Sequence, residues 1–178
     1  MIQEYTAWVG ANPLASAAIQ FAILGTLGEL VSVWIRRKQL IMPFTVRQFL
    51  LKIVGWALLG WIIKYGFTGM KGFTHALVDH RLIPARFGEG LGGALALSVF
   101  TNVLFGPQMM AFHRFSDNLI MRQKGFSGIE KAWWTLIWFW IPAHTVTFSL
   151  PRDYQIGLAA CWSVALGVIM GLSASRNR

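Results

Sequence analysis

The sequence predicts an all-α protein: a polytopic bundle of about five transmembrane helices in a single integral membrane domain, residues 1–178. Hydrophobic residues make up 55% of the chain and charged residues only 13%, whereas about 25% charged is usual in soluble domains. Four stretches of roughly membrane-spanning length contain no Asp, Glu, Lys or Arg: 5–28, 90–113, 132–151 and 154–175. These observations exclude a soluble globule, a disordered chain, a collagen and a coiled coil.

The helices follow from these stretches and from one further apolar segment, which carries Lys52 and Lys64. An ionised side chain at the bilayer centre costs about 2.5 to 3.5 kcal/mol, so charge-free segments locate spanning helices directly. The expected helices, in chain order, are Leu14–Ile35, Gln48–Gly69, Gly88–Phe112, Ile129–Phe148 and Tyr154–Ala174. Apolar residues recur at helical spacing after Phe73, so the second helix either continues beyond the membrane or bends onto its surface before Pro84.

Prolines lie inside the third and fourth expected helices, at Pro107 and Pro142. A proline removes a backbone N–H and clashes with the carbonyl one turn earlier, so we expect a kink at each. A gate could use two such deformable points, and a static bundle would only tolerate them.

Basic residues are distributed unevenly between alternate connections, and this bias sets the orientation of a membrane protein. Ten Lys and Arg lie in the first and third connections and the C-terminal tail, but only four lie in the other two connections. The N-terminus is therefore expected outside and the C-terminus inside. The same bias accounts for the net charge of +9, so no nucleic-acid partner is expected.

Ionisable groups within the spans are the strongest functional candidates, because they are costly unless paired or in contact with water. Helix depths at 1.5 Å per residue predict ion pairs of Glu29 with Lys52 and of Lys64 with Glu89, although Lys64 could instead extend to the membrane surface. The pairs could line a water-filled pathway or only fix the register of the helices.

Hydrogen-bonding side chains within the same spans, among them Asn102, His144 and Thr147, are numerous enough to line a narrow polar channel. Such side chains also serve as plain contacts between membrane helices, so they do not decide between a pathway and a static bundle.

Small residues predict where helices approach closely. Gly88 and Gly92 begin a small-residue face on the third helix, and Gly167 and Gly171 form a GxxxG motif in the fifth. In a polytopic chain this motif usually packs against a neighbouring helix of the same chain, and it leaves a homo-oligomer open.

Enzyme chemistry finds little support in the sequence, which has no HExxH, P-loop, GxSxG or paired acidic motif. His75, Asp79 and His80 are the nearest approach to a metal-binding set, and a solvated helix face explains them better. We therefore expect no catalytic residues, no metal and no cofactor.

Two regions resemble a known family. The first contains Tyr5, Asn12-Pro13, Gly28-Glu29 and Arg36-Arg37; the second contains Trp140, His144, Thr147, Phe148 and Pro151. In this order and spacing they resemble the 22-kilodalton peroxisomal membrane protein family, whose members also occupy the mitochondrial inner membrane. His144 and Thr147 stand where the family has Gln and Asn, so the resemblance is that of a distant relative.

The resemblance implies an integral membrane protein proposed to form a pore for small metabolites or ions. No targeting segment is recognised, so we expect the bacterial inner membrane, with the mitochondrial inner or peroxisomal membrane as the alternative. The predicted function is a narrow polar pathway for small solutes or ions, in a protein whose one certain partner is the lipid bilayer. The alternative is a non-transporting scaffold that binds a partner protein or lipid.

Overall fold

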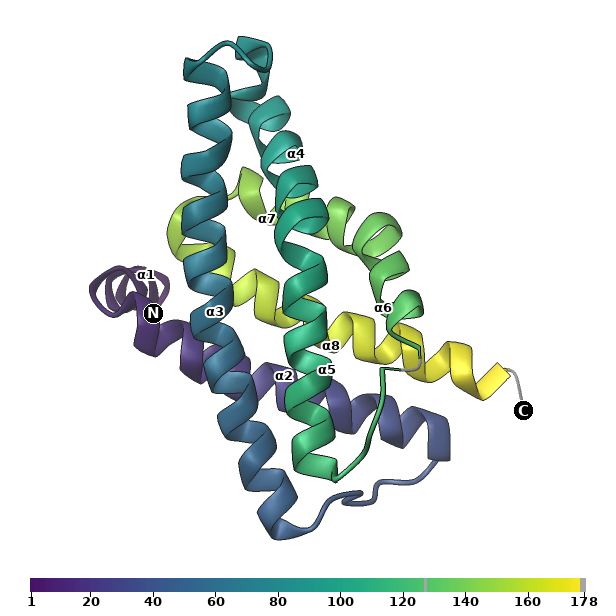
Figure 1. The fold of residues 1–178 in the computed structure, drawn as a ribbon. Helices are drawn as coiled ribbons and strands as arrows, with labels where there is room; N and C mark the ends of the chain where they lie inside the picture. Colours follow the sequence, from purple (N-terminus) through teal and green to yellow (C-terminus); the bar gives the residue numbers. More distant parts are fainter. Residues whose placement is uncertain (127, 177–178) are drawn as a thin grey trace.

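The computed structural model describes residues 1–126 and 128–176, with side chains as far as residue 173. Arg178 and the side chain of Arg176, counted above in the basic tail, lie outside this description. The described chain is helical and contains no strand; its α-helices are α1 Ile2–Ala11, α2 Pro13–Arg37, α3 Val46–Asp79, α4 Gly90–Phe100, α5 Gly106–Met121, α6 Ile129–Thr135, α7 Ile141–Ser149 and α8 Arg152–Arg176 (Figure 1).

Local sequence signals account for the ends of the first long helices. Pro13 opens α2, where its missing N–H and fixed φ are tolerated. A capping box between Thr45 and Gln48 opens α3, each side chain bonding to the other residue's backbone N–H. Helix α3 then runs through to Asp79, so the second expected helix continues past Gly69 instead of bending there.

A π-helical turn precedes each of the two prolines. The turn η2, Thr101–Phe105, joins α4 to α5 just before Pro107, and η3, Leu136–Trp140, joins α6 to α7 just before Pro142. Each turn contains the carbonyl with which the following proline would clash in a regular α-helix, and the wider π turn relieves that clash. Each proline thus follows an irregular turn, and the kink expected at each stays a prediction.

Four helical segments are long and apolar enough to cross a membrane: 13–37, 46–79, 90–121 and 152–173. At most 28% of the residues in the most apolar window of each segment are buried within the protein, so most residues in these windows are at least partly exposed. Soluble proteins rarely expose apolar patches of this size. The fifth expected helix corresponds to 129–149, which is helical but is not among the four, because Trp, Thr, Pro and His lower its mean hydropathy.

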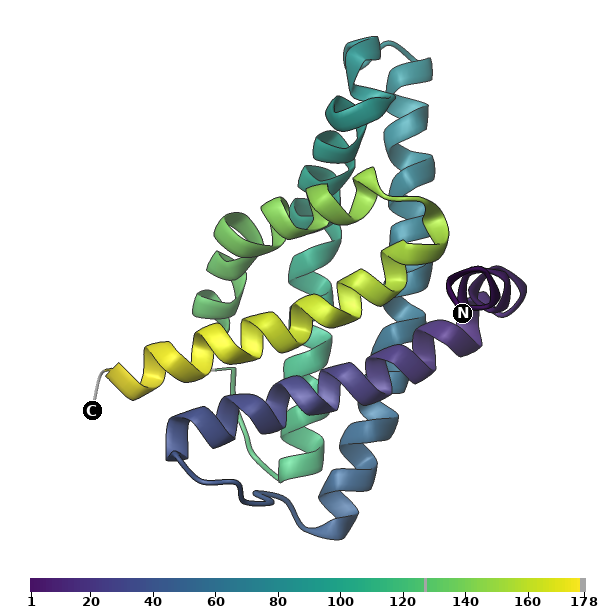
Figure 2. The ribbon, with the colours of Figure 1, turned by 180° about the vertical axis from the view of Figure 1, so that it is seen from behind.

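Helices α2 and α8 run side by side in the same direction and cross the antiparallel pair formed by α3 and α4–α5 (Figures 1 and 2). Small residues permit the close approach. A Cβ built on Gly28 would lie 2.7 Å from the backbone oxygen of Ser163, and one on Gly171 would lie 3.0 Å from that of Ser32. Gly167 likewise meets the backbone of Gly28, so the GxxxG motif packs within the chain.

The other two expected packing glycines have a local role. Gly92 packs against the short turn η1, Ala85–Phe87, and Gly88 contacts both this turn and Val78 at the end of α3. A Cβ on Gly88 would lie 3.2 Å from the Ala85 oxygen, and one on Gly92 would meet that of Arg86. These glycines shape the tip between α3 and α4.

Candidate functional site

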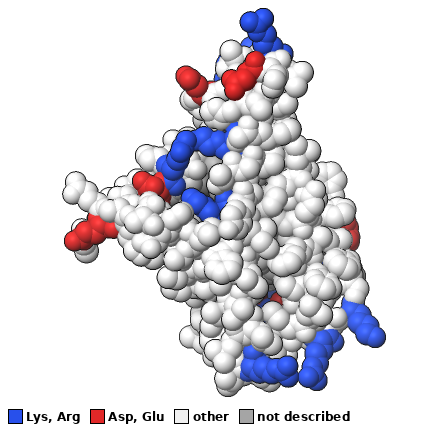
Figure 3. Space-filling model, turned by 60° about the vertical axis from the view of Figure 1, so that its left-hand side comes forward, with Lys and Arg blue, Asp and Glu red and all other residues white. Residues whose placement is uncertain are grey.

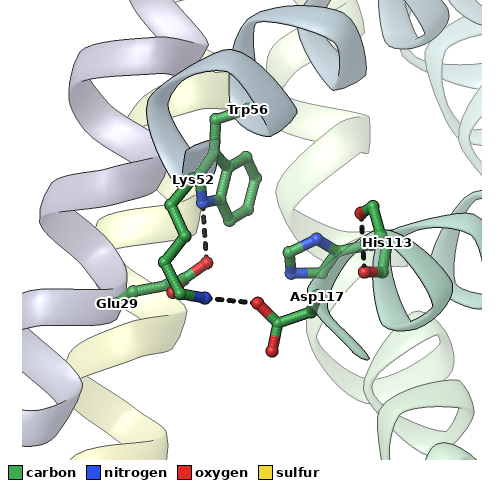
Figure 4. Close-up of polar contacts among 6 residues, drawn as sticks. Glu29, Lys52, Trp56, His113 and Asp117 are labelled. Atoms are coloured by element: carbon green, nitrogen blue, oxygen red, sulfur yellow. Dashed lines mark hydrogen bonds and ion pairs between the residues drawn. The ribbon is translucent and has the colours of Figure 1, made fainter. Parts of the chain in front are cut away.

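Glu29 of α2, Lys52 of α3 and Asp117 of α5 form an ion cluster on three helices (Figure 4). The Lys52 ammonium lies 2.6 Å from Glu29 Oε2 and is also paired with Asp117. Only 3% of Lys52 is exposed, whereas 21% of Glu29 and 31% of Asp117 are. The expected Glu29–Lys52 pair is therefore present, and a third member joins it.

Aromatic side chains hold this ion cluster in position. The Trp56 indole N–H donates to Glu29 Oε1 at 2.8 Å, and the Trp56 ring lies 4.6 Å from that of His113, centre to centre (Figure 4). Lys52 also lies 4.8 Å above the ring of Phe44. Gly25 makes room for the indole, because any Cβ there would collide with the Trp56 ring.

The ion cluster lines an open cavity of about 530 Å³ near the basic end of the molecule, which we call the ion-pair cavity. Arg36 and Arg114 also line it, so its charged groups are three cations and two carboxylates. Glu29 and Asp117, which are partly exposed, line this open cavity together with Lys52.

A much smaller cavity, of about 30 Å³, lies deeper between the helices. We call it the neck. Phe21, Ile63, Met109 and Trp140 line both the neck and the ion-pair cavity. Its volume holds about two water molecules, so no larger solute passes in this conformation.

The polar residues of the neck come from the π turns and α7. Asn102 Nδ2 donates to the Ser98 oxygen at 2.8 Å and lies 3.1 Å from His144 Nδ1. Two buried atoms of residues that line the neck, Thr101 Oγ1 and Trp140 Nε1, have no hydrogen-bond partner in the described chain. Thr147, also expected here, is fully buried instead against α8, where it accepts from Trp162 Nε1 at 3.1 Å.

Beyond the neck, Phe67 also lines a second open cavity of about 430 Å³. This basic hollow is formed by Lys64, Lys71, His75 and Arg152, together with Thr68, Gly72, Gln155 and Ile156. Figure 3 shows blue side chains around the hollow, and further Lys and Arg side chains at the opposite end of the molecule.

The expected Lys64–Glu89 pair is wrong. Gly88, the neighbour of Glu89, packs against Val78 of α3, about 20 Å further along that helix than Lys64. Because α3 is longer than expected, the depth of Glu89 was misjudged. Neither Lys64 nor Glu89 has an ion-pair partner among the described residues.

Sequence reasoning missed Asp117 and Trp56 as members of the site. Asp117 was expected in a connection after Phe112, but α5 continues to Met121. The i, i+4 spacing of His113 and Asp117 is the signal that could have placed both on one helix face. Among the described residues no group of three His, Cys, Asp or Glu side chains could hold a metal ion.

Comparisons with protein-family models, curated proteins and solved structures find no match. The resemblance to the 22-kilodalton family therefore stays a prediction, and functional reasoning depends on the geometry of this chain.

Proposed function

We propose that this protein is an integral membrane protein that conducts small solutes or ions through a narrow pathway between its helices. The observation that supports the proposal best is the sequence of three cavities. The ion-pair cavity and the basic hollow open at different sites, and the neck shares lining side chains with both. The apolar side chains of the neck keep the pathway closed in this conformation, as a hydrophobic constriction does in a gated channel.

The neck lies beside both π turns. Both π turns contribute lining residues, Thr101 and Asn102 from one and Leu136 and Trp140 from the other. π turns within α-helices occur frequently at functional sites. A small shift at either turn would move Trp140 or Asn102 relative to Phe67 and widen the neck, and its unpartnered hydrogen-bonding atoms would then meet water or solute.

The parallel arrangement of α2 and α8 supports five crossings with the N-terminus outside. Two parallel spanning helices require an odd number of crossings between them, and α3 and α4–α5 supply two. The third is residues 129–149, about 30 Å long at 1.5 Å per residue. The positive-inside rule then puts the connection between α2 and α3, with Arg36, Arg37 and Lys38, in the cytoplasm.

Widening the neck tests the proposal. In liposomes of purified protein, Phe67→Ala should raise the flux of small solutes several-fold, because Phe67 is the one described residue that lines both the neck and the basic hollow. Tyr65→Ala is the matched control, since Tyr65 lies on the same helix, is 63% exposed and lines none of the three cavities. Equal flux through folded Phe67→Ala, Tyr65→Ala and protein-free liposomes would contradict a pathway through the neck.

A further inference from the structure

Three cations converge on the basic hollow from two helices. Lys64 and Lys71 lie seven residues apart on α3, a spacing that puts them on one face with His75. Arg152 is the first residue of α8 and faces the same hollow. Both lysines are half-buried, and within the described chain none of the three cations is ion-paired with a carboxylate.

The nearby carboxylates do not offset this charge. Asp153 follows Arg152, but its Oδ1 lies toward α1, 3.7 Å from where a Cβ on Gly10 would be. Glu89 is exposed and lines an adjoining cavity that shares Lys71, His75 and Gln155 with the hollow, without forming an ion pair. Like charges held together in a partly buried site repel one another, and a bound anion would relieve that repulsion.

The hollow has the size and chemistry for a small anion. Its volume of about 430 Å³ exceeds that of a phosphate or a small carboxylic acid, and its walls present ammonium, guanidinium, hydroxyl and amide donors. Phe67 and Ile156 form its apolar floor. A bound anion would therefore lie directly above the side chain that closes the neck.

We propose that Lys64, Lys71 and Arg152 form a binding site for a small phosphate-type anion at the mouth of the neck. Its role in selecting anions for transport rests on the pathway proposed above, whereas binding itself does not. The same chemistry would also recognise the phosphate of a lipid headgroup, so two sources are compared.

The first experiment measures binding of inorganic phosphate to lipid-free protein in detergent micelles, at constant ionic strength with chloride as the reference anion. Phosphate should bind saturably to the wild-type protein and about tenfold more weakly to the double variant Lys64→Gln/Lys71→Gln. Lys124→Gln/Lys131→Gln is the matched control, because both of its lysines are exposed and neither lines the hollow. A second arm replaces phosphate with micelles containing phosphatidylglycerol and compares the same three proteins.

If phosphate binding depends on Lys64 and Lys71, the ligand of the site is a free anion. If only binding of phosphatidylglycerol depends on them, the ligand is a lipid headgroup. Either result supports the site. Equal binding by the wild type and the Lys64→Gln/Lys71→Gln variant in both arms overturns it, and so does no binding at all. The two proposals fail separately: bound phosphate with no flux through Phe67→Ala refutes the pathway alone, and flux without anion binding refutes the site alone.

Discussion

Lys52 of α3 is ion-paired with Asp117 of α5, on the side of its ammonium that faces away from Glu29 (Figure 4). One cation thus links three helices. Lys52 is almost completely buried, and an unpaired charge in such a position is strongly destabilising. A change in the charge of the ion cluster should therefore change the stability of the helix bundle.

Removing the Lys52 ammonium alone should strongly destabilise the protein. Lys52→Met leaves two carboxylates facing each other without a counter-ion, and we expect a loss of about 3 to 5 kcal/mol in the free energy of unfolding. Unfolding in mixed detergent micelles measures this loss.

Neutralising all three charges should restore much of that stability, because no uncompensated charge then remains. The variant is Glu29→Gln/Lys52→Met/Asp117→Asn. If Lys52→Met alone unfolds like the wild type, the Lys52 pairs contribute nothing, and a structural role of the ion cluster is wrong.

The contribution of Trp56 can be tested separately. Trp56→Phe keeps an aromatic ring but removes the N–H that donates to Glu29, and hydrogen bonds to charged groups contribute about 1.5 to 3 kcal/mol. Trp138→Phe is the control, since Trp138 is 52% exposed and no hydrogen bond of its indole is found in the described chain. Thermal unfolding in detergent should show a lower midpoint for Trp56→Phe only.

The sequence predicted the helical class, the two proline sites and the Glu29–Lys52 pair, because hydropathy, the missing proline N–H and helix rise are local properties. It did not predict where the helices end when they continue beyond their apolar segments. The apolar segments end before Lys71 and Arg114, but α3 and α5 continue beyond both residues. Because of this error, Asp117 was not expected in the site, and Lys64 was paired with a residue that lies at a different depth in the bundle.

The close approach of α2 and α8 could also not be predicted from the sequence. A GxxxG motif shows that a helix can be approached closely, but it does not identify the partner. In the structure, Gly28 of α2 packs against the backbone of Ser163 on α8. Such a contact is set by tertiary packing, which no local pattern encodes.

Adding a side chain at Gly28 should destabilise the packing of α2 against α8. In Gly28→Ala the new Cβ would lie 2.7 Å from a backbone oxygen, so α2 and α8 must separate, at a cost of about 1 to 3 kcal/mol. Gly69→Ala should instead be neutral or stabilising, because nothing lies within 4 Å of its Cβ and alanine favours a helix. Equal unfolding midpoints for the two variants would show that the close contact does not hold the helices together.

The number of crossings can be decided by labelling introduced cysteines. In a Cys161→Ala background, Lys124→Cys lies before residues 129–149 and Ser149→Cys lies at their end, and both positions are exposed. If this segment crosses the membrane, a membrane-impermeant maleimide labels Ser149→Cys from outside, and labels Lys124→Cys only after permeabilisation. Gln39→Cys, in the basic connection between α2 and α3, should behave like Lys124→Cys. Labelling of Lys124→Cys and Ser149→Cys from the same side would mean that 129–149 does not cross; the parallel helices α2 and α8 could then not both span the bilayer.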